Sequence, residues 1–125
     1  RDCWREILPL YDYVYDPAAV ERKVAATPYR YEAHNYAFSK NLPHYDLRAD
    51  LPRITAPTLV TVGRTDWITP ASCSEEIAAL IPGARLVIFE ESGHSPQIEQ
   101  AEEWTATVRE FLHGVMSPVG TGTTV

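Results

Sequence analysis

The chain has 125 residues, of which 45% are apolar, and its formal net charge is −6. This composition is too apolar for a disordered chain and is sufficient for one small domain. The acidic balance, with no basic cluster and no apolar stretch near the ~20 residues of a membrane helix, argues against nucleic-acid or membrane partners.

Residues 1–43 are predicted to be helical and are rich in aromatic side chains. Asp16 before Pro17 is typical of a helix start, because aspartate caps the first turn and proline is favoured at the first helical position. The helix is expected to continue over residues 18–27. Residues 44–56 are interpreted as a connector to the next part of the chain.

Two short apolar runs, at residues 59–62 and 86–89, predict strands that are buried on both faces of a parallel sheet. The sequence between them predicts a helix over residues 70–81, with Thr69 as its N-cap. A right-handed crossover of this kind places the two strands next to each other, with their carboxyl ends at one edge.

A last helix is expected from residue 101, and Trp104 should pack on the sheet as a core residue. Residues 57–113 would therefore form a βαβα unit, and residues 114–125 are predicted to be a mobile tail. Two strands that are apolar on both faces need neighbours, so we expect strands from a second chain to complete the sheet.

Each predicted strand leads into a turn with one chemically capable side chain, Asp66 after the first and His94 after the second. An aspartate that accepts the Nδ1 proton of a histidine fixes its tautomer and leaves Nε2 free to take a proton from a nucleophile. Either residue alone could be structural, but together they predict a catalytic pair. Asp50 and Glu91 are weaker candidates for the acid, because neither follows a buried strand in the right place.

Other positions near the pair have predicted roles. Trp67 and Ile68, which follow the acid, are expected to form one wall of the substrate site. Gly93 is expected to let the backbone turn tightly before the histidine. The histidines and cysteines lack metal-ligand spacing, so no metal or cofactor is expected. Cys3 and Cys73 fall in different predicted regions, which indicates free thiols and a cytoplasmic enzyme.

The motifs G-R-x-D-x-I-x-P, around Asp66, and S-G-H-S-P-x-x-E, around His94, resemble the carboxy-terminal part of α/β-hydrolases. The resemblance covers about residues 42–113 and is closest to the prolyl aminopeptidase (proline iminopeptidase) branch. It implies a carboxy-terminal piece of an α/β-hydrolase core, preceded in residues 1–43 by part of a helical cap.

The resemblance also implies a triad in the chain order nucleophile, acid, histidine. No G-x-S-x-G motif occurs in this sequence, and Arg1 is not a translation start. We therefore expect a companion chain that carries the nucleophilic serine and the oxyanion hole, in a heterodimer with this one.

The activity implied is that of an aminopeptidase that releases an amino-terminal proline or a similar residue from a small peptide. Three alternatives stay open: an esterase or lactonase acting on an ester, an epoxide hydrolase with an aspartate nucleophile, and a noncatalytic fragment. Acidic cap residues bind the substrate amine in the family, and the acids of this region are Glu6, Asp12, Asp16 and Glu32.

Overall fold

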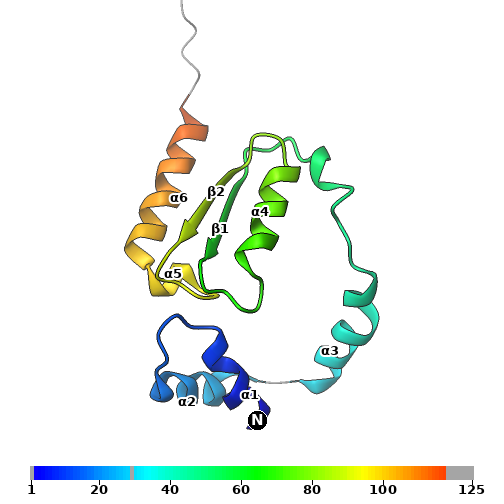
Figure 1. The fold of residues 1–125 in the computed structure, drawn as a ribbon, viewed down its shortest axis with the longest axis vertical. Helices are drawn as coiled ribbons and strands as arrows, with labels where there is room; N and C mark the ends of the chain where they lie inside the picture. The colour runs from blue at the N-terminus through cyan, green and yellow to red at the C-terminus, as the bar shows by residue number, and fades with distance from the viewer. Residues whose placement is uncertain (1, 29, 118–125) are drawn as a thin grey trace, which may run out of the picture.

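The computed structural model describes residues 2–28 and 30–117. At its centre two parallel strands lie side by side, and a helix flanks them on either side (Figure 1). In chain order the elements are α1 (Asp2–Ile7), α2 (Pro17–Ala26), α3 (Tyr31–Tyr36), β1 (Leu59–Gly63), α4 (Ala71–Leu80), β2 (Arg85–Phe89), α5 (Pro96–Glu99) and α6 (Ala101–Met116). The predicted α/β class is confirmed.

The two strands pair in parallel, from Leu59 opposite Arg85 to Gly63 opposite Phe89. Burial deepens toward their carboxyl ends, where Phe89 is fully buried. The backbone N–H of Arg64 donates to the carbonyl oxygen of Phe89 at 2.8 Å, which continues the pairing beyond the last residue of β1. The two turns that follow the strands therefore leave the sheet at the same edge, as the sequence predicts.

The structure corrects the predicted start of α4 and the predicted end of α6. Helix α4 begins at Ala71, with Pro70 as its N-cap, and no side chain caps it. The prediction of Thr69 as the cap is wrong, because the Thr69 hydroxyl bonds to the carboxylate of Asp66 instead. Helix α6 continues to Met116, so the first part of the predicted tail is helical, and residues 118–125 lie outside the described part.

Helix α6 packs on the strands through Trp104, whose indole Nε1–H donates to the hydroxyl of Thr61 at 3.3 Å. Trp104 is half-buried rather than enclosed, because the strand pair offers it only a narrow surface. None of the helices in residues 2–28 and 30–117 combines the length and the apolar character needed to cross a membrane.

The amino-terminal helices form a small core of their own beside the carboxyl ends of the strands (Figure 1). Leu8, Val20 and Val24 are buried together, and Trp4 and Tyr11 pack against them. The predicted start of α2 is confirmed, because the carboxylate of Asp16 accepts the backbone N–H of Ala18 at 2.9 Å. Hydrogen bonds from the backbone N–H groups of Ala19 and Ala18 lower the pKa of the Asp16 carboxyl.

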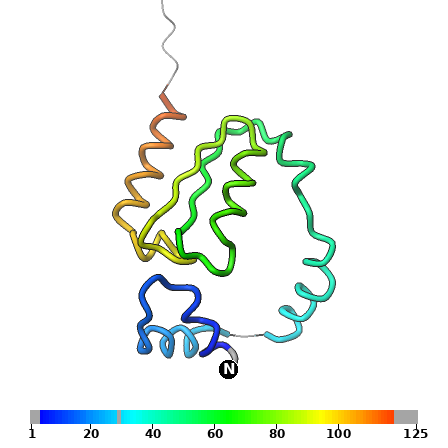
Figure 2. Tube along the Cα trace, in the orientation of Figure 1, coloured from blue at the N-terminus to red at the C-terminus, as the bar shows by residue number. Residues whose placement is uncertain are grey.

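Beyond α2 the chain passes through α3, which has no buried residue, and returns along the outside of the molecule to β1 (Figure 2). The returning residues 44–56 include a 3-10 turn, Leu51–Arg53, and are largely exposed. The segment between α1 and α2 contacts the turn after β2, where the backbone N–H of His94 donates to the carbonyl oxygen of Tyr11.

Candidate active site

The turns that follow β1 and β2 bring Asp66 and His94 together. Oδ2 of Asp66 lies 3.0 Å from Nδ1 of His94, although 28 residues separate them in the chain. The juxtaposition expected from the strand pattern is thus present, and a catalytic role for the two residues remains a prediction. Their geometry is that of an acid orienting an imidazole.

The carboxylate of Asp66 is buried and fully supplied with hydrogen-bond donors. Oδ1 accepts the backbone N–H groups of Ile68 at 2.8 Å and Thr69 at 2.9 Å, and Oδ2 accepts the Thr69 hydroxyl at 2.9 Å in addition to the imidazole. Burial acts to raise the pKa of Asp66, but these hydrogen bonds outweigh it and keep the pKa below its ordinary value. Asp66 is therefore an ionised acceptor at neutral pH.

Because an ionised carboxylate can only accept, the Nδ1 of His94 carries the proton of the shared bond and Nε2 is left as the basic nitrogen. The His94 side chain is 35% exposed, so the imidazole is open on one side. The backbone N–H of His94 donates to the carbonyl oxygen of Tyr11 at 2.6 Å. The Tyr11 ring meets the imidazole edge-on, with ring centroids 5.0 Å apart.

Two glycines let three backbone segments approach one another at the site. A Cβ at Gly63 would collide with the carbonyl oxygens of Ser92 and Gly93, and a Cβ at Gly93 would collide with that of Tyr11. Among the described glycines only Gly83 has a positive φ. The backbone bends at Gly93 and His94, as predicted, but Gly93 does so without a positive φ. Its role is to leave room for the segment around Tyr11.

Sequence reasoning missed Glu99, whose carboxylate supports the histidine turn. Its Oε2 accepts the backbone N–H of Gly93 at 2.8 Å and that of Ser95 at 3.3 Å, and its Oε1 accepts the backbone N–H of Tyr13. The available signal was the last position of the S-G-H-S-P-x-x-E motif. Acidic side chains close to a predicted catalytic turn are candidates for binding its backbone.

The next residue, Gln100, supports the other end of the same turn. Its side-chain oxygen accepts the backbone N–H of Glu91 at 3.0 Å and the hydroxyl of Ser92 at 2.8 Å. The side-chain amide nitrogen of Gln100 donates to Glu103 at 2.6 Å. The buried hydroxyl of Ser92 is thus a structural donor.

The predicted wall residues lie in the open. Trp67 is 74% exposed and Ile68 is 37% exposed. Trp67 and Asp66 line a hollow of about 280 Å³ with Arg64 and Pro70, so the indole stands beside the acid, whereas Ile68 is not among the lining residues. A substrate role for both remains a prediction.

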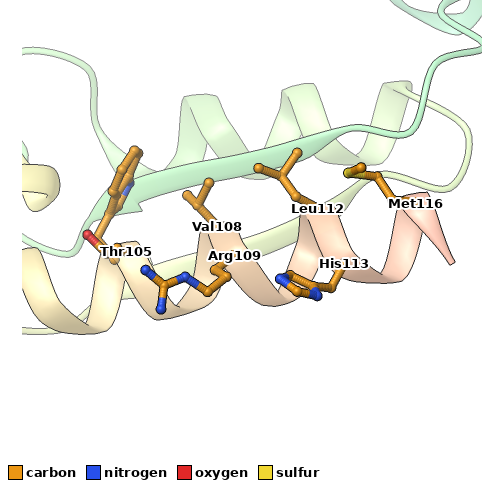
Figure 3. A pocket seen from close by; sticks show the side chains of 7 residues that line it. Thr105, Val108, Arg109, Leu112, His113 and Met116 are labelled. Carbon is orange, nitrogen blue, oxygen red and sulfur yellow. The ribbon is translucent and has the colours of Figure 1, made fainter.

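A second hollow, of about 310 Å³, lies along α6 (Figure 3). Its lining residues include Val108, Leu112 and Met116 and do not include Asp66 or His94. This hollow is therefore a feature of the helix surface, separate from the pair.

The two weaker candidates for the acid, Asp50 and Glu91, take no part in the hydrogen bond to Nδ1 of His94. Asp50 is exposed and pairs with Arg53 at 3.0 Å, and Glu91 is exposed next to β2. Within the described residues, no group of three or more His, Cys, Asp or Glu side chains could hold a metal ion.

The acids of the amino-terminal region are used in different ways. Asp16 caps α2. Asp12 is half-buried and binds the ammonium group of Lys23 at 2.6 Å. Glu6 and Glu32 are exposed. Asp12 lies between Tyr11, which binds the backbone of His94, and Tyr13, which binds the carboxylate of Glu99.

The family model described as "alpha/beta hydrolase fold" matches residues 13–101 of this chain. The proline iminopeptidase PfmaB of Pestalotiopsis fici is 36% identical over 104 residues, which cover 83% of this chain and 37% of that protein. A pimeloyl-[acyl-carrier protein] methyl ester esterase of Neisseria meningitidis is 37% identical over 71 residues, covering 57% of this chain and 23% of that protein.

Solved structures show the same likeness. The enol-lactonase from Burkholderia xenovorans LB400 superposes with a TM-score of 0.75 at 25% identity, covering 89% of this chain and 44% of that one. The chain thus spans less than half the length of the relatives that it matches.

Proposed function

The chain belongs to the α/β-hydrolase family, and on that premise we propose that it supplies the acid, Asp66, and the histidine, His94, of a Ser-His-Asp triad. The observation that carries the proposal is the 3.0 Å bond between Oδ2 of Asp66 and Nδ1 of His94. An ionised, buried acid on Nδ1 orients the imidazole and stabilises its protonated form. Nε2 of His94 is thereby left free to accept a proton from the nucleophile.

The nucleophile in this proposal is a serine on a companion chain, which also provides the oxyanion hole. The hydroxyl of Ser92, two residues before His94, is already engaged by the side-chain oxygen of Gln100. The sequence holds no G-x-S-x-G motif. The two described strands pair only with each other, which leaves room on their outer edges for further strands.

The reaction then follows from the pair. His94 Nε2 removes the serine proton as the serine oxygen attacks the carbonyl carbon of an amide or ester. The protonated His94 gives that proton to the leaving amine or alcohol, and the acyl group stays on the serine. His94 next takes a proton from a water molecule as the water oxygen attacks the acyl-serine. His94 then returns this proton to the serine oxygen. Asp66 stays ionised throughout.

For the substrate we propose a peptide with an amino-terminal proline or a similar residue, in a cytoplasmic aminopeptidase. Relatives named proline iminopeptidase, at 36%, 39% and 38% identity, support this specificity. The exposed free thiol of Cys73 agrees with a reducing compartment. An esterase or lactonase is the second candidate, supported by the names of an esterase and an enol-lactonase among the similar proteins.

The test uses the complete enzyme with a chromogenic proline amide, its N-acetylated form and an aryl ester. An aminopeptidase cleaves the free proline amide fastest and rejects the acetylated form. An esterase or lactonase prefers the ester and is indifferent to a free amine. His94→Ala abolishes turnover if the triad is right, and His44→Ala, at an exposed histidine outside the site, retains it.

A serine-directed phosphonate reports on the nucleophile. We expect it to label the companion chain in the wild type and to label it far more slowly in His94→Ala. Full labelling and full activity in His94→Ala would contradict the proposed triad.

A further inference from the structure

The carboxylate of Glu99 joins two parts of the molecule that are remote in sequence. Oε2 receives backbone N–H groups from Gly93 at 2.8 Å and Ser95 at 3.3 Å, the two neighbours of His94. Oε1 receives the backbone N–H of Tyr13, 86 residues away. One side chain therefore binds the histidine turn with one oxygen and the amino-terminal segment with the other.

The same two segments also meet through the histidine itself. The backbone N–H of His94 donates to the carbonyl oxygen of Tyr11 at 2.6 Å, and the Tyr11 ring lies at a right angle to the imidazole, 5.0 Å between centroids. Three consecutive backbone N–H groups, those of Gly93, His94 and Ser95, are thus bound by Glu99 or Tyr11. The main chain of the histidine has little freedom left.

We propose that Glu99 is a positioning residue that sets the orientation of His94 by joining its turn to residues 11–13. The inference rests on the proposed function of His94. Hydrogen bonds from N–H groups to a carboxylate are about twice as strong as neutral ones, and the two bonds to the turn are partly buried. An imidazole displaced by about 1 Å can lose on the order of 10²-fold in rate.

An amide at this position cannot replace the carboxylate. Glu99→Gln keeps the size of the side chain but has a single oxygen, so its NH₂ group would face either the N–H of Tyr13 or those of Gly93 and Ser95. One side of the link is lost whichever way the amide turns. Glu99→Asp keeps both oxygens but is shorter by one methylene, so it too cannot span both segments.

The experiment measures kcat, KM and the melting temperature of the complete enzyme for wild type, Glu99→Gln, Glu99→Asp and Glu102→Gln. Glu102, exposed in the first turn of α6, is the control of matched charge. We expect kcat of Glu99→Gln to fall about 10- to 100-fold, with KM nearly unchanged, at temperatures where the variant is fully folded. The ¹H–¹⁵N signals of the His94 imidazole should shift in this variant and not in Glu102→Gln.

A merely structural role gives a different result. In that case Glu99→Gln lowers the melting temperature, but the folded variant keeps kcat within about threefold of wild type and its imidazole signals stay in place, which overturns the inference. If Glu99→Gln does not fold, Glu99→Asp is judged by the same criteria. Failure of the proposed function is recognised separately, because His94→Ala would then remain active.

Discussion

Asp66 and His94 stand 3.0 Å apart at the ends of two paired parallel strands, Oδ2 to Nδ1. The backbone N–H of Thr65 donates to the carbonyl oxygen of Ser92 at 3.1 Å, so the two turns are also bonded to each other. The distance between acid and imidazole is consequently set by main-chain pairing. The two turns are held at this distance by the paired strands and by the bond between Thr65 and Ser92.

Asp66→Asn tests the role of the acid. An asparagine can present its NH₂ group to Nδ1, which favours the tautomer with the proton on Nε2 and removes the base. We expect turnover to fall by about 10⁴-fold, the scale known for the serine-protease triad. Steady-state kinetics of the complete enzyme on its preferred substrate measures the loss.

Asp50→Asn is the matched control, because Asp50 is exposed and pairs with Arg53 away from the imidazole. It should keep turnover close to that of the wild type. A near-normal rate in Asp66→Asn, or an equal loss in both variants, would refute the assignment of the acid.

The stability of the chain should depend on pH through Asp66. Its pKa is lowered in the folded state, because hydrogen bonds outweigh burial, and an unfolded aspartate titrates at about 3.9. The stabilisation is therefore complete above that pH and is lost as the pH falls through the folded pKa. Urea unfolding of wild type and Asp66→Asn between pH 3 and 7 should show a constant difference in unfolding free energy at high pH, and this difference should shrink below about pH 4. A difference that grows toward low pH would mean that the folded pKa is raised.

Thr69 should tune the acid. Its hydroxyl donates to Oδ2 of Asp66 at 2.9 Å, and hydrogen bonds to charged groups contribute about 1.5–3 kcal/mol. Thr69→Ala is expected to raise the pKa of Asp66 and to lower the unfolding free energy, whereas Thr69→Ser keeps the hydroxyl and should resemble the wild type. The ¹³C carboxyl titration of Asp66 by NMR distinguishes the variants. Identical titrations in Thr69→Ala and wild type would show that the hydroxyl has no influence.

Gly93→Ala should destabilise the fold although it adds only one methyl group. The added Cβ would collide with the carbonyl oxygen of Tyr11 and lie 3.1 Å from the carbonyl carbon of Asp12, and backbone atoms cannot rotate away as a side chain would. We expect a loss of about 1–3 kcal/mol in unfolding free energy. Chemical denaturation provides the measurement.

Gly114→Ala is the control for this substitution. Gly114 lies inside α6, and a Cβ there has nothing within 4 Å. Alanine in a helix is favoured over glycine by up to about 1 kcal/mol, so this variant should be equal to or more stable than the wild type. Equal stability of Gly93→Ala and Gly114→Ala would contradict the close approach at Gly93.

The strands and the start of α2 were predictable because each depends on a short stretch of neighbouring residues. The contact between Asp66 and His94 was predictable from the two strands that precede them. Apolar runs mark the strands, and parallel pairing then fixes where the following turns emerge. The cap at Asp16 likewise depends on residues that adjoin it.

The support around the site was not predictable in the same way. The link from Glu99 to Tyr13 spans 86 residues, and the room that Gly93 leaves is filled by Tyr11. Thr69 was predicted as a helix cap because its local sequence suits that role, but the buried carboxylate of Asp66 competes successfully for the hydroxyl. Each of these contacts depends on which segments the fold brings together.

The close approach of backbone segments at Gly63 and Gly93 limits which positions of this protein can be substituted. Saturation libraries at those two positions would return mostly misfolded clones, because every other residue brings a Cβ into occupied space. Trp67, by contrast, is exposed and lines the same hollow as Asp66, so it can be substituted without disturbing these backbone contacts. For the proposed hydrolase, directed evolution aimed at new substrates is best begun at Trp67, which is predicted to form one wall of the substrate site.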